Sequence, residues 1–133
     1  MSNVWVIDAN VVVRACLELE GFAPLSGLAL AAPHLVISES LNALREGMWR
    51  GEISPELARQ ARLRLREIPV DLHPSAELID RAWEIAQTLG WAKTYDAEYV
   101  ALAQLLGCAL ITLDARLVRG AGHLVRIVGP TEI

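Results

Sequence analysis

Four acidic residues stand where one predicted element of this sequence gives way to the next: Asp8, Glu39, Asp96 and Asp114. Asp8 follows the apolar run Val4–Ile7, and Asp114 follows a second apolar run over 108–113. Glu39 opens a helical pattern just after the apolar residues 34–37, while Asp96 lies in the first turn of a helix predicted over 94–106. Carboxylate oxygens are the ligands that Mg²⁺ and Mn²⁺ prefer, so a cluster of these side chains would hold such a cation.

The elements that position these acids alternate between apolar runs and helical patterns. This alternation predicts an α/β fold, a parallel sheet of four or five strands with helices on both faces. The predicted strands are 4–7, 34–37, 68–72, 108–113 and 125–128, and Pro69 suits an edge position for the third. The predicted helices cover 11–19, 24–32, 38–50, 54–66, 75–89 with Ser75 as its cap, 94–106 with Thr94 or Asp96 as its cap, and 115–119.

The predicted topology brings the four acids to one edge of the sheet. Ligands of open parallel sheets bind beyond the carboxyl ends of the strands, where the strand order reverses. Asp8 and Asp114 end the two most apolar runs, which are candidates for neighbouring central strands. Glu39 directly follows the second predicted strand, so it lies at the same edge, and a right-handed crossover lets the amino end of the Asp96 helix face it. Two carboxylates about 5 Å apart repel by roughly 3 kcal/mol at an effective dielectric near 20, so the cluster calls for a cation.

A carboxylate pocket that holds divalent metal suits attack of water on a phosphodiester. Asn10 and Thr112 lie two residues from Asp8 and Asp114, where they could hydrogen-bond the ligating carboxylates. Each acid also has a simpler interpretation. Glu39 and Asp96 could stabilise helix dipoles, Asp8 could form a turn and Asp114 could cap a helix. Two further acids, Glu84 and Glu98, fall mid-helix and are expected to be solvated.

Composition bounds the class of protein. The 133 residues are 53% hydrophobic and 21% charged, which predicts a single folded domain over 1–133. The longest uncharged stretch, 21–38, contains Pro24, Gly27 and Pro33, which argues against a membrane span. Cys16 and Cys108 lie in apolar surroundings without a CxxC spacing, which indicates free thiols in a reducing cytoplasm.

The distribution of charge leaves the question of a nucleic-acid partner open. A net charge of −4 speaks against such a partner, yet clustered carboxylates would account for part of it. Half of the twelve basic residues lie between Arg45 and Arg66, where they form either a track for RNA or a solvated helix surface. These are Arg45, Arg50, Arg59, Arg62, Arg64 and Arg66.

The segments VIDAN, LVISESLNALRE, YDAEYVALAQLLG and LITLDARL resemble, in order and spacing, the motifs of PIN-domain proteins. The resemblance covers essentially the whole chain and is greatest to the VapC toxins of toxin–antitoxin pairs. It implies a three-layer α/β/α fold with about five parallel strands, and Asp8, Glu39, Asp96 and Asp114 as the catalytic and metal-binding acids. A further acid that the family sometimes has after the fourth position is missing here, where Arg116–Arg119 stand.

The resemblance also implies what the protein would do. It implies an endoribonuclease that depends on Mg²⁺ or Mn²⁺, cuts tRNA or ribosomal RNA and arrests translation. Such toxins are commonly homodimers, inhibited by a cognate VapB-type antitoxin whose tail, often with an arginine, enters the acidic pocket. The region of Trp49 and the piece 25–30 are candidate contacts for these partners, with core burial as the alternative for both.

Two other functions compete with the nuclease. One is a non-catalytic PIN module that binds RNA or a protein partner. The other is a receiver-like phosphoacceptor domain, which needs a lysine near its acidic pocket. The only lysine here, Lys93, falls in a predicted loop. The four acids together favour the nuclease over both.

Overall fold

The computed structural model describes residues 3–74 and 76–133, which form one five-stranded parallel sheet. Its strands are β1 (Val4–Ile7), β2 (Ala29–Pro33), β3 (Val70–His73), β4 (Ala109–Ile111) and β5 (Ile127–Val128). The strand order is β3-β2-β1-β4-β5, so the direction of winding reverses between β1 and β4. The predicted central pair is therefore confirmed, as is the edge position of the third strand.

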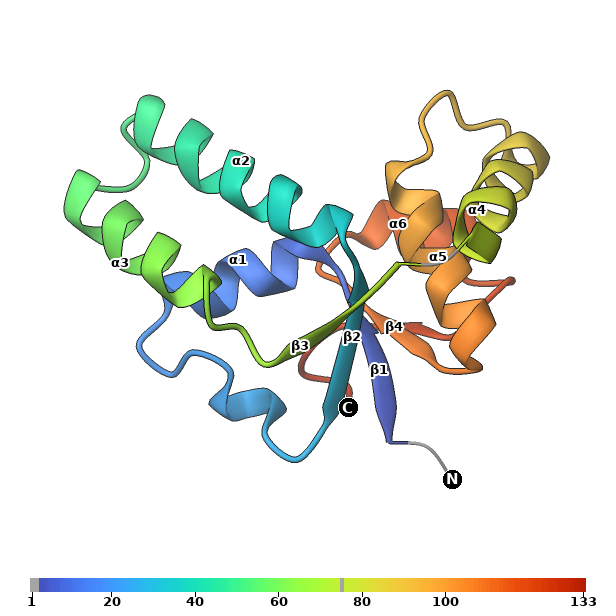
Figure 1. The fold of residues 1–133 in the computed structure, drawn as a ribbon, viewed down its shortest axis with the longest axis horizontal. Helices are drawn as coiled ribbons and strands as arrows, with labels where there is room; N and C mark the ends of the chain where they lie inside the picture. The colour runs from blue at the N-terminus through green and yellow to red at the C-terminus, as the bar shows by residue number, and fades with distance from the viewer. Residues whose placement is uncertain (1–2, 75) are drawn as a thin grey trace.

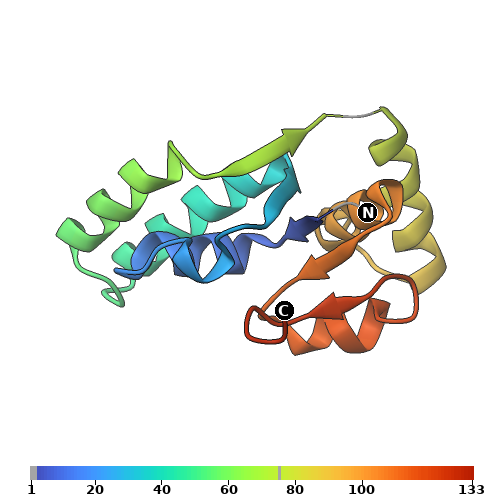
Figure 2. The same cartoon turned by 90° about the horizontal axis from the view of Figure 1, so that it is seen from below.

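Helices cover both faces of this sheet, as the α/β/α prediction requires. They are α1 (Ala9–Leu17), the 3₁₀ turn η1 (Ala23–Leu25), α2 (Leu35–Trp49), α3 (Pro55–Leu65), α4 (Ala76–Leu89), α5 (Tyr95–Leu106) and α6 (Ala115–Ala121). Figures 1 and 2 show α1, α2 and α3 gathered on one side of the strands and α4, α5 and α6 on the other. The predicted cap of α4, Ser75, lies outside the described residues.

The second strand is not where the sequence predicted it. Residues 34–37 form the start of α2, and the strand is Ala29–Pro33, within the piece expected to be helical. An apolar run of four residues fits a buried helix turn as well as a strand. Alanine is a weak strand former, so ALAAP gave little local signal, yet its small side chains suit a strand that α5 packs against.

The core lies between the sheet and its helices, with α5 at its centre. This helix contacts β1, β2 and β4, and its residues Ala97 and Tyr99–Ala103 are buried. Gly107 ends α5 in the left-handed conformation, with φ of 64°, a backbone region that side chains disfavour. Both cysteines are free thiols, Cys16 buried and Cys108 half-buried. No helix in the described ranges 3–74 and 76–133 is long and apolar enough to cross a membrane.

Candidate active site

Asp8 is the most buried of the four acids, with only 6% of its surface exposed. It directly follows β1 and caps α1, because its Oδ1 accepts a 2.7 Å hydrogen bond from the Ala9 amide. Its Oδ2 accepts a 2.8 Å hydrogen bond from the Thr112 hydroxyl and a 3.3 Å one from Asn10 Nδ2. Burial raises the pKa of Asp8 from 3.8 to about 6; these hydrogen bonds oppose the rise, and the charges of Asp96 and Glu39 add to it.

Asn10 and Thr112 join the segments that follow β1 and β4. Asn10 Nδ2 donates to Thr112 Oγ1 at 3.2 Å, and Asn10 Oδ1 accepts from the Leu113 amide at 3.1 Å. Thr112 Oγ1 also accepts from the Asp114 amide at 3.1 Å. These hydrogen bonds therefore hold the backbone at Asp114 close to the side chain of Asp8. This is the point where the strand order reverses.

Glu39 reaches the same region from α2. It lies one turn inside the helix, which begins at Leu35, so the expectation that it opens the helix was wrong. Its Oε1 accepts a 2.6 Å hydrogen bond from the hydroxyl of Tyr99, which is fully buried in α5. Partial burial raises the pKa of Glu39, the Tyr99 hydrogen bond opposes that rise, and the charge of Asp96 adds to it.

Asp96 and Asp114 complete the acidic cluster at its exposed side. Asp96 lies in the first turn of α5, after Thr94, which occupies the N-cap position without a side-chain hydrogen bond. Neither predicted cap of this helix is therefore a capping side chain. Asp114 caps α6, since its Oδ1 accepts a 2.9 Å hydrogen bond from the Arg116 amide. The Arg116 guanidinium also contacts Asp114, with Nε 3.3 Å from Oδ1.

The pKa values of this pair move in opposite directions. Partial burial and the negative charge of Asp114 raise the pKa of Asp96, although Arg116 opposes them. Burial alone would raise the pKa of Asp114, but hydrogen bonds and charge from Arg116 outweigh it and lower that pKa. Arg116 thus supplies positive charge beside Asp114.

The four acids line one pocket of about 370 Å³, with Ala9, Asn10, Val13 and Ala43. They come from four different parts of the fold, and Figure 1 shows α5 and α2 both starting at the end of the sheet where β1 and β2 finish. Within residues 3–74 and 76–133, no three Asp, Glu, His or Cys side chains are tight enough to make a complete ligand set. Glu39 instead accepts a hydrogen bond from Tyr99, and Asp114 accepts one from Arg116.

Glu98 differs from its prediction as a solvated residue. It is half-buried in α5, and burial together with the charge of Glu39 raises its pKa. Glu84, the other predicted control, is exposed on α4.

The fold is a parallel sheet between two layers of helices, with acids gathered beyond β1 and β4. Comparison with known proteins identifies the family that has this arrangement. The model of the PIN domain matches residues 5–122, and the chain belongs to the PIN-domain family. Within that family it is similar to proteins named as VapC ribonucleases. Ribonuclease VapC9 of Mycobacterium tuberculosis is 39% identical over 114 residues, 84% of this chain and 87% of that protein. Ribonuclease VapC1 of the same organism is 39% identical over 123 residues, 88% and 90%.

Solved structures share the fold. The crystal structure of PAE2754 from Pyrobaculum aerophilum superposes with a TM-score of 0.74 at 23% identity, over 99% of this chain and 94% of that one. A toxin–antitoxin complex from Klebsiella pneumoniae gives a TM-score of 0.66 at 19% identity, over 96% and 98%. The three-layer PIN fold expected from the sequence is therefore confirmed.

Proposed function

We propose that this protein is a divalent-metal-dependent endoribonuclease, acting in the cytoplasm as the toxin of a toxin–antitoxin pair. The observation that carries the proposal is the pocket in which Asp8, Glu39, Asp96 and Asp114 converge. The names of the relatives at 39% identity support RNA as the substrate. Cleavage of tRNA or ribosomal RNA would arrest translation.

The donor set of the pocket fits Mg²⁺ or Mn²⁺. All four candidate ligands are carboxylates, which are hard oxygen donors. Burial is the main cause of the raised pKa of Asp8, and the charges of Asp96 and Glu39 add to that rise. A bound divalent ion would activate water and offset charge on the phosphate. Asp8, Asp96 and Asp114 would hold it, and Glu39 lines the same pocket as a further candidate ligand.

The chain's own groups would supply the remaining chemistry. Thr112 and Asn10 hold Asp8 Oδ2, which fixes the direction in which this carboxylate faces. Glu39 has a raised pKa, so its carboxylate is suited to take a proton from the attacking water. Arg116 lies against Asp114 at the exposed side of the cluster, where its guanidinium could bind a phosphate oxygen.

The test is incubation of purified protein with total cellular RNA in Mg²⁺ or Mn²⁺, and again with EDTA. Discrete fragments that appear only with metal would support the proposal, and the sequence at their ends would identify the target RNA. A folded, metal-loaded sample that leaves every RNA intact would instead favour a non-catalytic PIN module that binds RNA.

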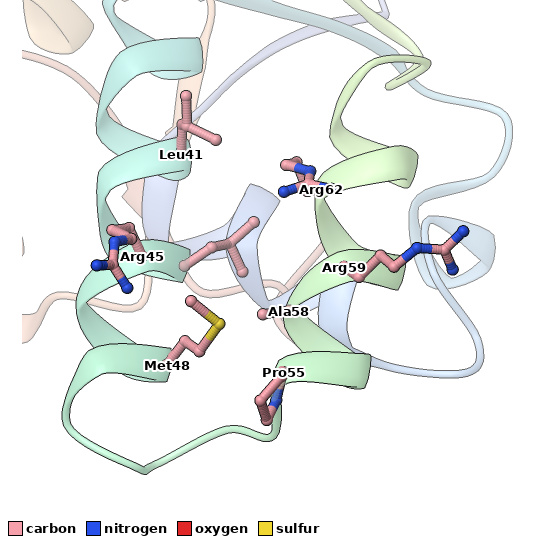
Figure 3. Close-up of a pocket in the computed structure, with 8 residues that line it drawn as sticks. Leu41, Arg45, Met48, Pro55, Ala58, Arg59 and Arg62 are labelled. Carbon is pink, nitrogen blue, oxygen red and sulfur yellow. The ribbon is translucent and has the colours of Figure 1, made fainter.

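An apolar groove between α2 and α3 suits the proposed antitoxin. The groove holds about 320 Å³, and Figure 3 shows Leu41 and Met48 on α2 across from Pro55 and Ala58 on α3. Leu41 is 46% exposed and Met48 half-buried, so this apolar side of α2 lies only partly in the core. Arginines complete the lining, namely Arg45, Arg59 and Arg62.

This combination favours one kind of partner segment. Apolar residues at helical spacing would fill the groove, while acidic residues beside them would meet the arginines. We therefore place an amphipathic, acidic helix of a VapB-type antitoxin here, with its tail reaching the carboxylate pocket. Of the contacts expected from the sequence, Trp49 is 77% exposed and stays a candidate, whereas Leu25 and Leu30 are buried core residues.

A second copy of the chain is the other proposed partner. Ile79 and Trp83 lie four residues apart on α4 and are 72% and 66% exposed, so they form one apolar strip on that helix. A homodimer would cover this strip. Sedimentation of the wild type and of Trp83→Ser tests it: a dimer that the substitution dissociates is expected, and an unchanged dimer would place the interface elsewhere.

A further inference from the structure

A second pocket adjoins the carboxylate pocket and shares two of its walls. It holds about 480 Å³ and is lined by Glu39, Gly90, Trp91, Ala92, Lys93, Tyr95 and Asp96. Glu39 and Asp96 also line the carboxylate pocket, so a chain that passes over the acids would continue directly into this space. The remaining lining residues come from the loop between α4 and α5 and from the first residue of α5.

The pocket offers an aromatic ring to solvent. Tyr95 is 52% exposed although it is a large ring at the first position of α5, a position that makes no demand for an aromatic side chain. The carboxylate that follows it, Asp96, belongs to the proposed catalytic cluster. Any group stacked on Tyr95 would therefore be held one residue from that cluster.

The loop that forms the pocket is fixed at its base. The Trp91 amide donates a 2.8 Å hydrogen bond to Ala86 O, and Gly90 adopts the left-handed conformation with φ of 70°. The Trp91 ring is half-buried and lies against Gly120 of α6. A Cβ atom at position 120 would lie only 3.5 Å from Cζ2 of Trp91. The wall of the pocket is thus preformed by the fold.

Lys93 gives this pocket a positive charge, opposite in sign to the charges of the neighbouring acids. It is the only lysine of the chain, it is exposed, and it lies in the loop two residues before Tyr95. An aromatic ring together with a nearby cation is the arrangement with which proteins hold single-stranded nucleic acid, the ring stacking on a base and the cation meeting a phosphate.

We propose that Tyr95 and Lys93 form a subsite for the nucleotide next to the phosphate that is cut, with the base stacked on Tyr95 and a flanking phosphate bound by Lys93. This inference rests on the proposed ribonuclease function and adds to it the recognition of an unpaired RNA segment. Base-paired RNA would leave no free base face for the ring, so the subsite selects loops and single strands.

The direct test is binding of a fluorescein-labelled single-stranded RNA, followed by anisotropy in the Asp8→Asn background so that the RNA stays intact. Tyr95→Ala and Tyr95→Leu are expected to weaken binding by about 10-fold or more, whereas Tyr95→Phe keeps the ring and stays within about 2-fold of the parent. Lys93→Gln is expected to reduce the slope of log K against log salt by about 0.7. Leu19→Ala, which removes a 98% exposed apolar side chain outside both pockets, is the control and should bind normally.

Two results would overturn the subsite. One is unchanged binding in Tyr95→Ala and Tyr95→Leu, with both variants folded by thermal melting. The other is equal weakening in Tyr95→Phe, which would assign the effect to the hydroxyl. In an otherwise wild-type chain, the subsite predicts a raised KM with kcat nearly constant; a lowered kcat alone would mean that Tyr95 only positions Asp96. RNA binding that depends on Tyr95 without any cleavage would instead contradict the ribonuclease and keep the subsite.

Discussion

The hydroxyl of Tyr99, buried at the centre of α5, donates a 2.6 Å hydrogen bond to Glu39 on α2. This contact joins α2 to α5 through two residues that lie 60 positions apart in the chain. It also places an acid of the pocket on the largest fully buried side chain of the core, which is Tyr99. The position of Glu39 is therefore determined by core packing as well as by its own helix.

Tyr99→Phe is expected to remove this hydrogen bond and keep the ring. Loss of a hydrogen bond to a charged group should lower the free energy of unfolding by about 1.5–3 kcal/mol, as measured with urea. The bond lowers the pKa of Glu39, so that pKa should rise in the variant when the carboxyl group is followed by NMR. An unchanged pKa would show that Tyr99 contributes to Glu39 only by packing.

The raised pKa of Asp8 predicts that the metal-free protein loses stability as the pH rises. A carboxyl group whose pKa is higher in the folded state favours folding when protonated, so its contribution is full below about pH 3.8 and is lost as the pH passes about 6. The change corresponds to about 3 kcal/mol, and Glu39 and Asp96 act in the same direction.

The measurement is the free energy of unfolding in EDTA between about pH 4 and about pH 7. Asp8→Asn carries no titrating group at this position, so its stability should fall less over the same range. Addition of Mg²⁺ at neutral pH should restore stability to the wild type, because an ion that binds only the folded chain stabilises it. Equal pH dependence in both proteins would mean that Asp8 titrates normally.

Thr112→Val is expected to weaken the site without touching a proposed ligand. It removes the hydroxyl that donates a 2.8 Å hydrogen bond to Asp8 Oδ2 and accepts a hydrogen bond from the Asp114 amide. Loss of such a supporting group typically costs about 10–100-fold in metal affinity or activity. Thr112→Ser keeps the hydroxyl and should retain most of both, as measured by Mn²⁺ titration and by RNA cleavage. A Val variant as active as the Ser variant would contradict this role.

Leu41→Glu should separate inhibition from cleavage. The substitution puts a charge into the apolar groove between α2 and α3, at a residue that is already exposed, so folding should be little affected. An antitoxin helix seated in the groove should then bind at least about 10-fold more weakly in calorimetry. RNA cleavage should be unchanged, since Leu41 does not line the carboxylate pocket. Normal antitoxin affinity would exclude the groove as its binding site.

The sequence located the acids more reliably than the elements that carry them. Asp8 and Asp114 follow short apolar runs that pair as central strands, and both also cap helices. A cap was the simpler interpretation of Asp114, whereas the simpler interpretation of Asp8 was a turn. Glu39 reaches the pocket even though residues 34–37 were assigned to a strand, because α2 begins directly after β2. The second strand was therefore predicted too far along the chain, but Glu39 still lies at the predicted edge of the sheet.

What the sequence could not provide is a set of side-chain contacts, most of them between residues far apart in the chain. The hydrogen bond from Tyr99 to Glu39 and the half-buried position of Glu98 both follow from how α2 packs near α5. The pairing of Arg116 with Asp114 depends on a rotamer and not on periodicity. Spacing along the chain gives no information about such contacts. Acids that directly follow parallel strands, in contrast, must lie at the same edge of the sheet, because the topology brings the strand ends together.

We propose that the clustered acids cut RNA with the help of a divalent ion. The most direct measurement is the rate at which purified wild type, Asp96→Asn and Glu84→Gln cleave one RNA identified as a target, in Mn²⁺ and in EDTA. Glu84 is the matched control, an exposed acid on α4 outside the pocket. Cleavage that is lost by at least about 100-fold in Asp96→Asn and in EDTA, but kept in Glu84→Gln, is the predicted result. Full activity in Asp96→Asn would contradict it.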